Sequence, residues 1–416
     1  MCIGSAGSGH HFQWWQKTLG RFIQRPPPGQ SWRWTLSVQF FIEQSGHLAP
    51  YAILLLVYLL LSIQSELLRN RLFAVPCIGA LLLFSGFREA ITPDLEEYKR
   101  LYESISSFDA GFIEPSFLYI SKALNAIGMD YHALFVVYSF VTLLFAYLGI
   151  RNYTKNVKLS LLLYILIPSC FLNMFVEMRE VCAIALVLYA TSLLNSNWSR
   201  FRLTKCVAAA ALSVSFHYSA LIYWIIFVVF RKLIRRQYST GAYLSVILSS
   251  LLIPTSVLIG AIRIGIYPFA PAKYRGFLEM FMRQDEGINA GQILKAVIYV
   301  SVAICFVLTR SRRDSEDGSD KMKDVISLNL FVIGVAILNL SRATAELSRL
   351  AYYFLIQQIV LFPSTLERIN GYARRLLAAY CLFLFYLAQF AWGLFYYSPA
   401  AGYIFLNYRN VLLSGL

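Results

Sequence analysis

Long apolar stretches separated by short polar segments fill most of the chain after residue 46. Runs of this length are typical of helices that cross a bilayer, because lipid offers no partners for backbone polar groups. Several are shorter than the roughly 20 residues of a straight crossing. The pattern predicts an all-α, polytopic integral membrane protein with about twelve transmembrane helices. The predicted spans cover residues 49–63, 72–86, 132–150, 159–173, 177–195, 203–216, 218–231, 242–262, 293–309, 325–341, 349–363 and 376–396.

The same pattern divides the chain into two parts. Residues 1–46 are basic and aromatic and lack a continuous apolar run, which predicts an N-terminal arm that is interfacial or disordered. Residues 47–416 are expected to form a single transmembrane domain. Its longest polar interruptions are two loops, at about residues 87–131 and 263–292.

Composition and charge support the membrane interpretation and orient the chain. Of the 416 residues, 58% are hydrophobic and 14% are charged, against about 25% charged in soluble domains. The net charge of +15 comes from short basic clusters between apolar runs. The positive-inside rule accounts for such clusters, so we expect no nucleic-acid partner. If they are cytoplasmic, loops 87–131 and 263–292 face the outside, with short amphipathic helices in them.

The stretch 203–231 has two interpretations. It is long enough for one span, yet basic clusters at 200–205 and 231–236 both mark cytoplasmic ends. A helical hairpin that turns near residues 215–217 satisfies both clusters. Each arm would then be about 21 Å long, which is short of the roughly 30 Å hydrocarbon core. A single span is the alternative.

The first outer loop contains ionisable residues on expected helices. Thr92 and Pro93 predict a helix start that places Asp94 and Tyr98 on one face. Glu114 precedes another proline and a second amphipathic helix. Both segments are interpreted either as surface helices or as the edge of a polar site.

Further ionisable residues lie at the mouths of apolar helices. Arg179 and Glu180 begin the span 177–195, and His217 lies deep in an apolar run. A charge inside a span costs about 2.5 to 3.5 kcal/mol, so it normally has a partner or a function. An internal Arg179–Glu pair and a hydrogen-bonded core histidine are the structural alternatives.

Cations on the outer side oppose the positive-inside trend. They include Arg88, Arg179, Arg275 and Arg349. Arginine binds phosphate in a bidentate manner, so phosphate or diphosphate is the expected ligand. A divalent metal at Asp94 and Glu96 is not expected, since neighbouring helix positions point apart. We therefore predict neither a metal nor another cofactor.

These residues resemble the motifs of bacterial polysaccharide polymerases of the Wzy and EpsG type. The resemblance runs from about residue 49 to the C-terminus. Glu180 and Phe277 stand where the family pattern has glutamine and tyrosine. The matching elements are, in chain order, Gly86-Phe87-Arg88 with Asp94 and Tyr98, Glu114-Pro115, Arg179-Glu180, Phe216-His217-Tyr218-Ser219-Ala220-Leu221, Lys273-Tyr274-Arg275-Gly276-Phe277, and Arg349-Leu350 with Tyr352-Tyr353.

The resemblance implies an enzyme of the bacterial inner membrane with a fold like that of class C glycosyltransferases. Such enzymes polymerise undecaprenyl-diphosphate-linked oligosaccharide repeat units into O-antigen or a related surface polysaccharide at the periplasmic face. Its partners would be lipid-linked oligosaccharide and membrane lipid, with a flippase and a chain-length regulator of the same pathway to consider. The residues implied in diphosphate and sugar binding are Arg88, Tyr98, Arg179, Glu180, Tyr274, Arg275, Arg349 and Tyr352.

The implied reaction needs stabilisation of a leaving diphosphate and removal of a proton from a sugar hydroxyl. His217 is the preferred base, because an imidazole exchanges a proton near neutral pH. Asp94 and Glu114 are the alternative bases. Two other classes remain open: a ligase or other lipid-linked glycosyltransferase, and a lipid-linked oligosaccharide flippase, which would carry ionisable residues along a midplane cavity.

Overall fold

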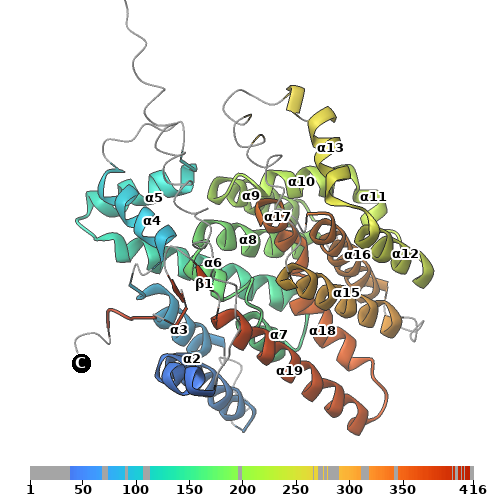
Figure 1. Cartoon of the computed structure of the whole chain (residues 1–416), viewed down its shortest axis with the longest axis horizontal. Helices are drawn as coiled ribbons and strands as arrows, with labels where there is room; N and C mark the ends of the chain where they lie inside the picture. The colour runs from blue at the N-terminus through green and yellow to red at the C-terminus, as the bar shows by residue number, and fades with distance from the viewer. Residues whose placement is uncertain are drawn as a thin grey trace, which may run out of the picture.

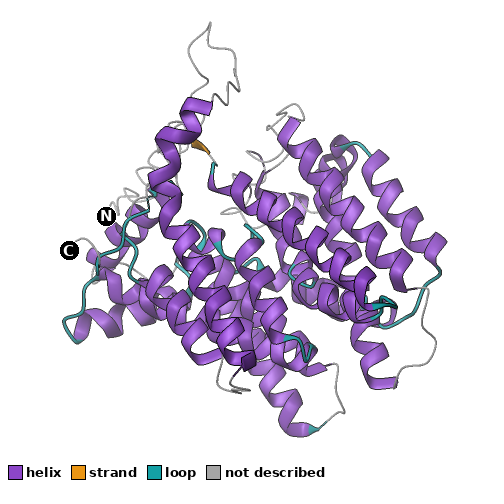
Figure 2. Ribbon diagram, turned by 90° about the horizontal axis from the view of Figure 1, so that it is seen from below, coloured by secondary structure: helices purple, strands orange, loops and turns teal. Residues whose placement is uncertain are grey.

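Helices make up nearly all of the described part of the chain in the computed structural model (Figure 1, Figure 2). Within that part, the only strands are β1 (Tyr397–Ser398) and β2 (Gly402–Tyr403), which pair antiparallel. The structure describes residues 38–67, 74–89, 92–105, 113–194, 199–265, 267–269, 275, 279, 290–310, 318–341, 345–395, 397–398, 402–403, 405–406 and 408–412.

The helices are numbered in chain order. The N-terminal half contains α2 (Val38–Leu67), α3 (Ala74–Gly86), α4 (Pro93–Glu103), α5 (Pro115–Ala126), α6 (Tyr131–Tyr153), α7 (Val157–Leu166), the 3-10 helix η2 (Leu172–Phe175), α8 (Met178–Leu194) and α9 (Arg200–Phe216). The C-terminal half contains α10 (Ala220–Val229), α11 (Arg231–Ile234), α12 (Thr240–Leu252), α13 (Thr255–Gly265), the 3-10 helix η3 (Tyr267–Phe269), α15 (Ala290–Arg310), α16 (Gly318–Leu340), α17 (Ala345–Leu355), α18 (Gln358–Glu367) and α19 (Tyr372–Leu394).

In the part of the chain that the structure describes, four helices are long and apolar enough to cross a bilayer: His47–Ser65, Tyr131–Tyr153, Met322–Leu340 and Tyr372–Leu394. Five shorter apolar helices accompany them among the described residues. The all-α prediction is therefore confirmed at the level of fold class, while the count of about twelve transmembrane helices stays a prediction. The helical part also begins earlier than expected, because α2 starts at Val38, inside the expected arm 1–46; residues 1–37 lie outside the described residues.

Two predicted spans end early for the same physical reason. The expected helix 159–173 stops at Leu166, and the expected helix 242–262 divides into α12 and α13. In both cases an isoleucine in extended conformation, Ile167 or Ile253, precedes a proline. Proline disfavours the α conformation at the residue before it and contributes no N–H to the helix. A third expected helix, 349–363, is also divided, and it forms α17 and α18.

Helix α8 lies at the centre of the bundle, packed between α6 and α9 and touching α10 and α17 (Figure 1). Every residue from 181 to 188 is buried. A helix that is apolar all round is stable only when it is enclosed on all sides. The polar residues of its first turn, Arg179 and Glu180, are therefore held at a fixed point in the interior.

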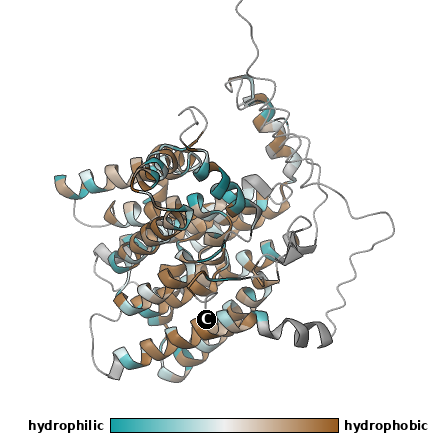
Figure 3. Ribbon diagram, turned by 90° about the vertical axis from the view of Figure 1, so that its left-hand side faces the viewer, coloured by the Kyte–Doolittle hydropathy of each residue, from teal (hydrophilic) through white to brown (hydrophobic). Residues whose placement is uncertain are grey.

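The outer helices present apolar side chains to the surroundings. Only 11% of the most apolar stretch of α19 is buried inside the protein. The corresponding stretch of α2 is 22% buried. Ile53, Leu56 and Leu377 are among the large apolar residues that are more than half exposed. In Figure 3, where hydrophobic residues are brown, such residues recur along most of the helices. Such surfaces are too large for a water-soluble protein, and they indicate a membrane protein.

Candidate active site

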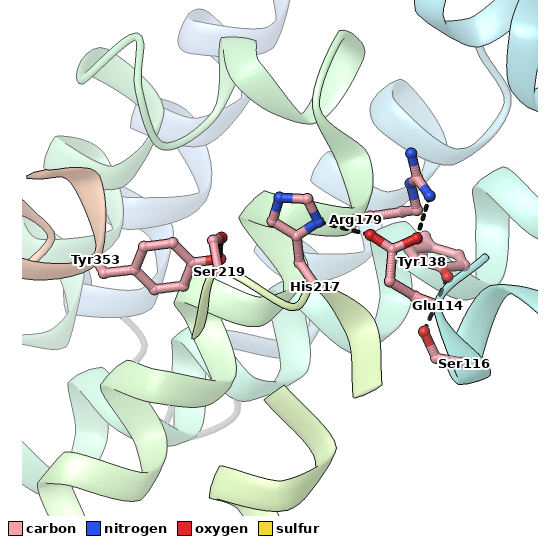
Figure 4. A network of polar contacts seen from close by, with 7 residues as sticks. All are labelled: Glu114, Ser116, Tyr138, Arg179, His217, Ser219 and Tyr353. Atoms are coloured by element: carbon pink, nitrogen blue, oxygen red, sulfur yellow. Dashed lines mark hydrogen bonds and ion pairs between the residues drawn. The ribbon is translucent and has the colours of Figure 1, made fainter. Parts of the chain in front are cut away.

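Glu114 is placed by the start of α5. It occupies the N-cap position with extended backbone, and Pro115 takes the first helical position. The Glu114 side chain makes no capping hydrogen bond. Instead, the Nη1 atom of Arg179 donates to its Oε2 atom, and Nδ1 of His217 lies 2.9 Å from its Oε1 atom (Figure 4). One carboxylate thus joins residues from three separate segments of the chain.

His217 lies at a break between two helices. Helix α9 ends at Phe216, His217 is extended with φ −155° and ψ 124°, and α10 begins at Ala220. The indole of Trp224 donates back to the Ser213 hydroxyl at 3.0 Å, so the chain turns at this point. The two arms of the predicted hairpin are thus separate helices, α9 and α10, and the stretch 203–231 is not one uninterrupted helix. The His217 side chain at this break keeps 29% of its surface exposed.

Arg179 lies in the first turn of α8 and is enclosed by aromatic rings. Its guanidinium carbon is 4.9 Å from the centroid of Tyr98 and 5.6 Å from that of Phe117. Its side chain keeps 23% of its surface exposed. Cation–π contacts and the ion pair with Glu114 therefore fix its position without closing it off.

The charge state of Glu114 follows from its neighbours. Burial raises the pKa of a carboxyl group, but here the hydrogen bond from His217 and the charge of Arg179 act in the opposite direction and outweigh it. The pKa of Glu114 is consequently held below its usual range. Glu114 is an ionised group at neutral pH, and it is available to orient a hydrogen-bond donor.

Two hydroxyl pairs support this cluster (Figure 4). The Ser219 and Tyr353 hydroxyls are 2.9 Å apart, which ties the turn after His217 to α17. The Ser116 and Tyr138 hydroxyls are 3.3 Å apart, which ties the start of α5 to α6. The first contact thereby positions the backbone beside His217, and the second positions the backbone beside Glu114.

A second polar cluster lies beside the first turn of α8. Arg349 of α17 pairs with Glu177 through a distance of 2.9 Å between its Nε atom and Oε1. The Lys295 ammonium of α15 donates to the Tyr352 hydroxyl at 2.6 Å. Glu180 is buried, with 3% of its surface exposed. Helix α8 thus connects the Glu114 cluster to this second cluster.

The structure brings most of the sequence-predicted residues to these two clusters. Glu114, His217, Arg179 and Tyr98 form the first, and the electrostatic neighbours of Tyr352 in the second include Glu180 and Arg349. The predicted helix start at Thr92 is present, since its hydroxyl accepts from the Leu95 N–H at 3.2 Å. Asp94 follows on the half-exposed side of α4, one turn before Tyr98.

Arg88 has a different environment from the one expected of a substrate ligand. It is 1% exposed and donates to the carbonyl oxygens of Ser85 and, at 2.8 Å, Met174. Its guanidinium carbon also lies 5.0 Å from the ring centroid of Phe135 and 5.2 Å from that of Phe175. This enclosure by carbonyls and rings is typical of a residue that holds the bundle together, and a role of Arg88 in substrate binding stays a prediction.

Two further predicted residues, Tyr274 and Arg275, follow η3 in the sequence. Arg275 is exposed, and its guanidinium donates a 3.4 Å hydrogen bond to the carbonyl of Pro268. Tyr274 lies outside the described residues. Among the described residues, no group of three or more histidine, cysteine, aspartate or glutamate side chains is arranged to hold a metal ion.

Sequence reasoning missed three residues of the clusters as site candidates: Glu177, Lys295 and Tyr353. Lys295 is the only charged residue between positions 293 and 309, so an isolated charge in an apolar helix was the available signal. Glu177 carried a similar signal, because it is an ionisable residue at the mouth of the apolar span 177–195. Tyr353 carried none, since its role depends on packing between helices distant in sequence.

Fold and site define a helical, membrane-type protein with a carboxylate, an imidazole and several cations gathered around one central helix. The chain belongs to the EpsG family, whose family model matches residues 71–410. This family is associated with glycosyltransferase-like polymerase activity, and membership suggests a role in polysaccharide polymerisation. No curated protein matches the chain, and no solved structure matches it.

Proposed function

We propose that this protein polymerises undecaprenyl-diphosphate-linked oligosaccharide repeat units into O-antigen or a related surface polysaccharide. The reaction is glycosyl transfer from the lipid diphosphate donor, at the periplasmic face of the bacterial inner membrane. The observation that carries the proposal is the position of the Glu114 carboxylate between Arg179 and the Nδ1 atom of His217.

This arrangement favours His217 as the general base. With Nδ1–H donated to an ionised carboxylate, the neutral imidazole keeps its lone pair on Nε2. Glu114 fixes the ring orientation and stabilises the positive charge that follows proton uptake. Glu114 itself is a poorer base, because its pKa is lowered and its proton affinity is correspondingly weak.

The reaction balances without a further reactant. The hydroxyl oxygen of the acceptor sugar forms a bond to the anomeric carbon of the donor, and its proton passes to Nε2 of His217. The bond between the anomeric carbon and the diphosphate oxygen breaks, and the electron pair leaves with the diphosphate. Arg349 and the exposed part of Arg179 supply positive charge for this leaving group.

The charge pattern around His217 supports an outer site. Basic clusters lie at residues 200–205 and 231–236, at the ends of α9 and α10 that are remote from His217. The positive-inside rule assigns both clusters to the cytoplasmic side. The helix break at His217 then points to the opposite face of the membrane.

The test is chain extension by the purified protein in lipid vesicles that contain the lipid-linked repeat unit. We expect His217→Ala to lower the polymerisation rate by at least about 100-fold, the usual contribution of a general base. His132→Ala is the matched control, because Nδ1 of His132 is also 2.9 Å from a carboxylate, that of Asp130, but lies at the start of α6. Near-normal polymerisation by the His217→Ala protein would refute the assignment.

A deletion strain tests the class of enzyme. Loss of a polymerase leaves acceptors that carry a single repeat unit, whereas loss of a ligase leaves acceptors with none. Long chains in the absence of the protein would contradict the proposed function altogether.

A further inference from the structure

Tyr138 of α6 contacts both chain segments that form the Glu114–His217 pair. Its hydroxyl lies 3.3 Å from that of Ser116, two residues after Glu114 (Figure 4). Its ring packs edge-on against Phe216, the residue before His217, with ring centroids 5.2 Å apart and planes at 77°. Two functional groups that are 103 residues apart in the sequence therefore share one neighbour.

The position of Tyr138 is itself fixed by the centre of the bundle. Its side chain is fully buried. Helix α6 packs along the buried helix α8, where Gly149 lets the two helices approach closely. Helix α5 lies against both α6 and α9. In so dense an interior a large ring moves only together with its surroundings, so α6 is a rigid reference for both segments.

Both members of the pair lie at helix ends. Glu114 precedes α5 with extended backbone, and His217 is extended between α9 and α10. Helix ends fray more readily than helix interiors, so neighbouring side chains decide where such residues lie. The contact between Ser219 and Tyr353 acts on the His217 side, whereas the contacts of Tyr138 act on both sides.

We propose that Tyr138 is a positioning residue, which holds Nδ1 of His217 within hydrogen-bond distance of the Glu114 carboxylate. Its ring fixes the end of α9, and its hydroxyl fixes the start of α5. This inference rests on the proposed function for the reaction in which His217 takes part. The geometry that it assigns to Tyr138 can also be tested without that reaction.

Chain extension by the purified protein in lipid vesicles measures the effect on the reaction. We expect Tyr138→Leu, which removes both contacts, to lower kcat by about 10- to 100-fold and to leave KM within about threefold of the wild type. The reason is that a misplaced base slows the chemical step and leaves substrate binding intact. Tyr138→Phe keeps the ring and loses one neutral hydrogen bond, so its kcat should stay within about fivefold of the wild type. Phe216→Leu removes the ring contact from the other side and should lower kcat in the same way, which keeps the test decisive if Tyr138→Leu does not accumulate.

Tyr386→Leu is the matched control. Tyr386 of α19 is 1% exposed, its ring packs edge-on against Phe362 with centroids 5.2 Å apart, and its hydroxyl donates to the amide oxygen of Gln358 at 2.9 Å. Both leucine variants shorten a buried tyrosine and should lower the unfolding temperature to a similar extent. Tyr386→Leu should nevertheless keep kcat near the wild-type value. Equal losses of kcat in the two variants, or a rise in KM alone for Tyr138→Leu, would overturn the inference.

The tautomer of His217 tests the positioning without catalysis. In protein that carries isotope-labelled histidine, nitrogen NMR shows which ring nitrogen holds the proton, and the signals missing from His217→Ala identify His217. At about pH 8, where an ordinary imidazole is neutral, the wild type should show a protonated Nδ1, because its hydrogen bond to Glu114 selects that tautomer. Tyr138→Leu should lose this signal and Tyr386→Leu should keep it. His132, whose Nδ1 lies 2.9 Å from the Asp130 carboxylate, is the internal reference and should not change.

The two measurements separate this inference from the proposed function. A protonated Nδ1 at His217 in the Tyr138→Leu protein would overturn the positioning role. Wild-type protein that makes no polymer, together with loss of the His217 signal in Tyr138→Leu, would instead overturn the proposed function and leave the role of Tyr138 in place.

Discussion

Glu114 is a nearly buried carboxylate whose two oxygens have different partners, Arg179 and His217. A buried charge is tolerable only when such partners replace the lost hydration. The same contacts that make the group stable also give His217 a defined orientation. At the scale of single residues, stability and proposed chemistry therefore depend on the same hydrogen bonds.

The first prediction concerns pH and stability. Because the pKa of Glu114 is lowered in the folded protein, its ionised form stabilises the fold above the unfolded-state pKa, and this stabilisation is lost as the pH falls through the folded-state pKa. We expect Glu114→Gln to cost about 2 kcal/mol at neutral pH. The difference from the wild type in thermal unfolding should persist at about pH 5.5 and shrink below about pH 4. A difference that grows on acidification would contradict the sign.

The second prediction separates Arg88 from the binding residues. Arg88→Met leaves buried carbonyl oxygens without donors and should cost about 3 kcal/mol or more in unfolding free energy. Arg100→Met is the control, because Arg100 is 64% exposed in its pair with Glu97 and should change stability by less than about 0.5 kcal/mol.

Activity per folded molecule distinguishes the two roles of Arg88. A structural residue changes the amount of folded protein, so the Arg88→Met protein that remains folded should polymerise near the wild-type rate. A large loss of rate at unchanged thermal stability would show that Arg88 acts on substrate instead.

At the scale of elements, the site depends on how closely helices approach one another. Gly149 of α6 packs against Leu188 of α8, where an added Cβ atom would be 2.9 Å from the leucine Cγ. Gly334 of α16 lies against α17, where an added Cβ would be 2.8 Å from the Cβ of Phe354 and 3.0 Å from the backbone nitrogen of Leu355. Helix α17 carries Arg349 and Tyr352, so this contact sets the position of the second cluster.

The third prediction uses this contact. Gly334→Ala should destabilise the protein by about 1 to 3 kcal/mol, because the methyl group meets atoms that have no flexible end to move away. It should also slow polymerisation by displacing α17. Gly79→Ala is the matched control in α3: nothing lies within 4 Å of its added Cβ, and alanine should stabilise the helix by up to about 1 kcal/mol. Equal thermal unfolding of the two variants would contradict the packing argument.

At the scale of the whole molecule, the C-terminal segment returns to the N-terminal helices (Figure 1). The Tyr51 hydroxyl of α2 donates to the carbonyl of Phe405 at 2.8 Å. Tyr408 stacks on Phe84 of α3 with ring centroids 4.2 Å apart and donates to its carbonyl at 2.9 Å. These contacts join sequence segments more than 300 residues apart.

The fourth prediction tests this closure. Tyr408→Ala removes the stacked ring and its hydrogen bond, and it should cost about 3 kcal/mol in unfolding free energy. Leu412→Ala, at a residue that is 51% exposed, is the control and should have little effect. Thermal unfolding in detergent measures both. Similar unfolding temperatures for the two variants would show that the C-terminal segment contributes nothing to the fold.

Much of the candidate site was predictable, because charge in an apolar chain is conspicuous. Arg179, Glu114 and His217 each stand out against their surroundings in the sequence. Their mutual contact was not predictable, since it joins positions 65 and 103 residues apart. The sequence also did not show that Arg88, unlike the other predicted arginines, is enclosed in the interior. Its contacts with Met174 and Phe135 depend on how the helices pack.

The sequence was sufficient for the helical class and the family, because hydrophobic pattern, proline and local motifs act over a few residues. It left the turn near His217 as one of two interpretations of the stretch 203–231. Only the tertiary structure decided which ionisable groups meet, which helices approach closely at Gly334, and that Lys295 reaches Tyr352. The physical reason is that these contacts depend on side-chain packing between helices far apart in the chain, and no local pattern encodes such distances.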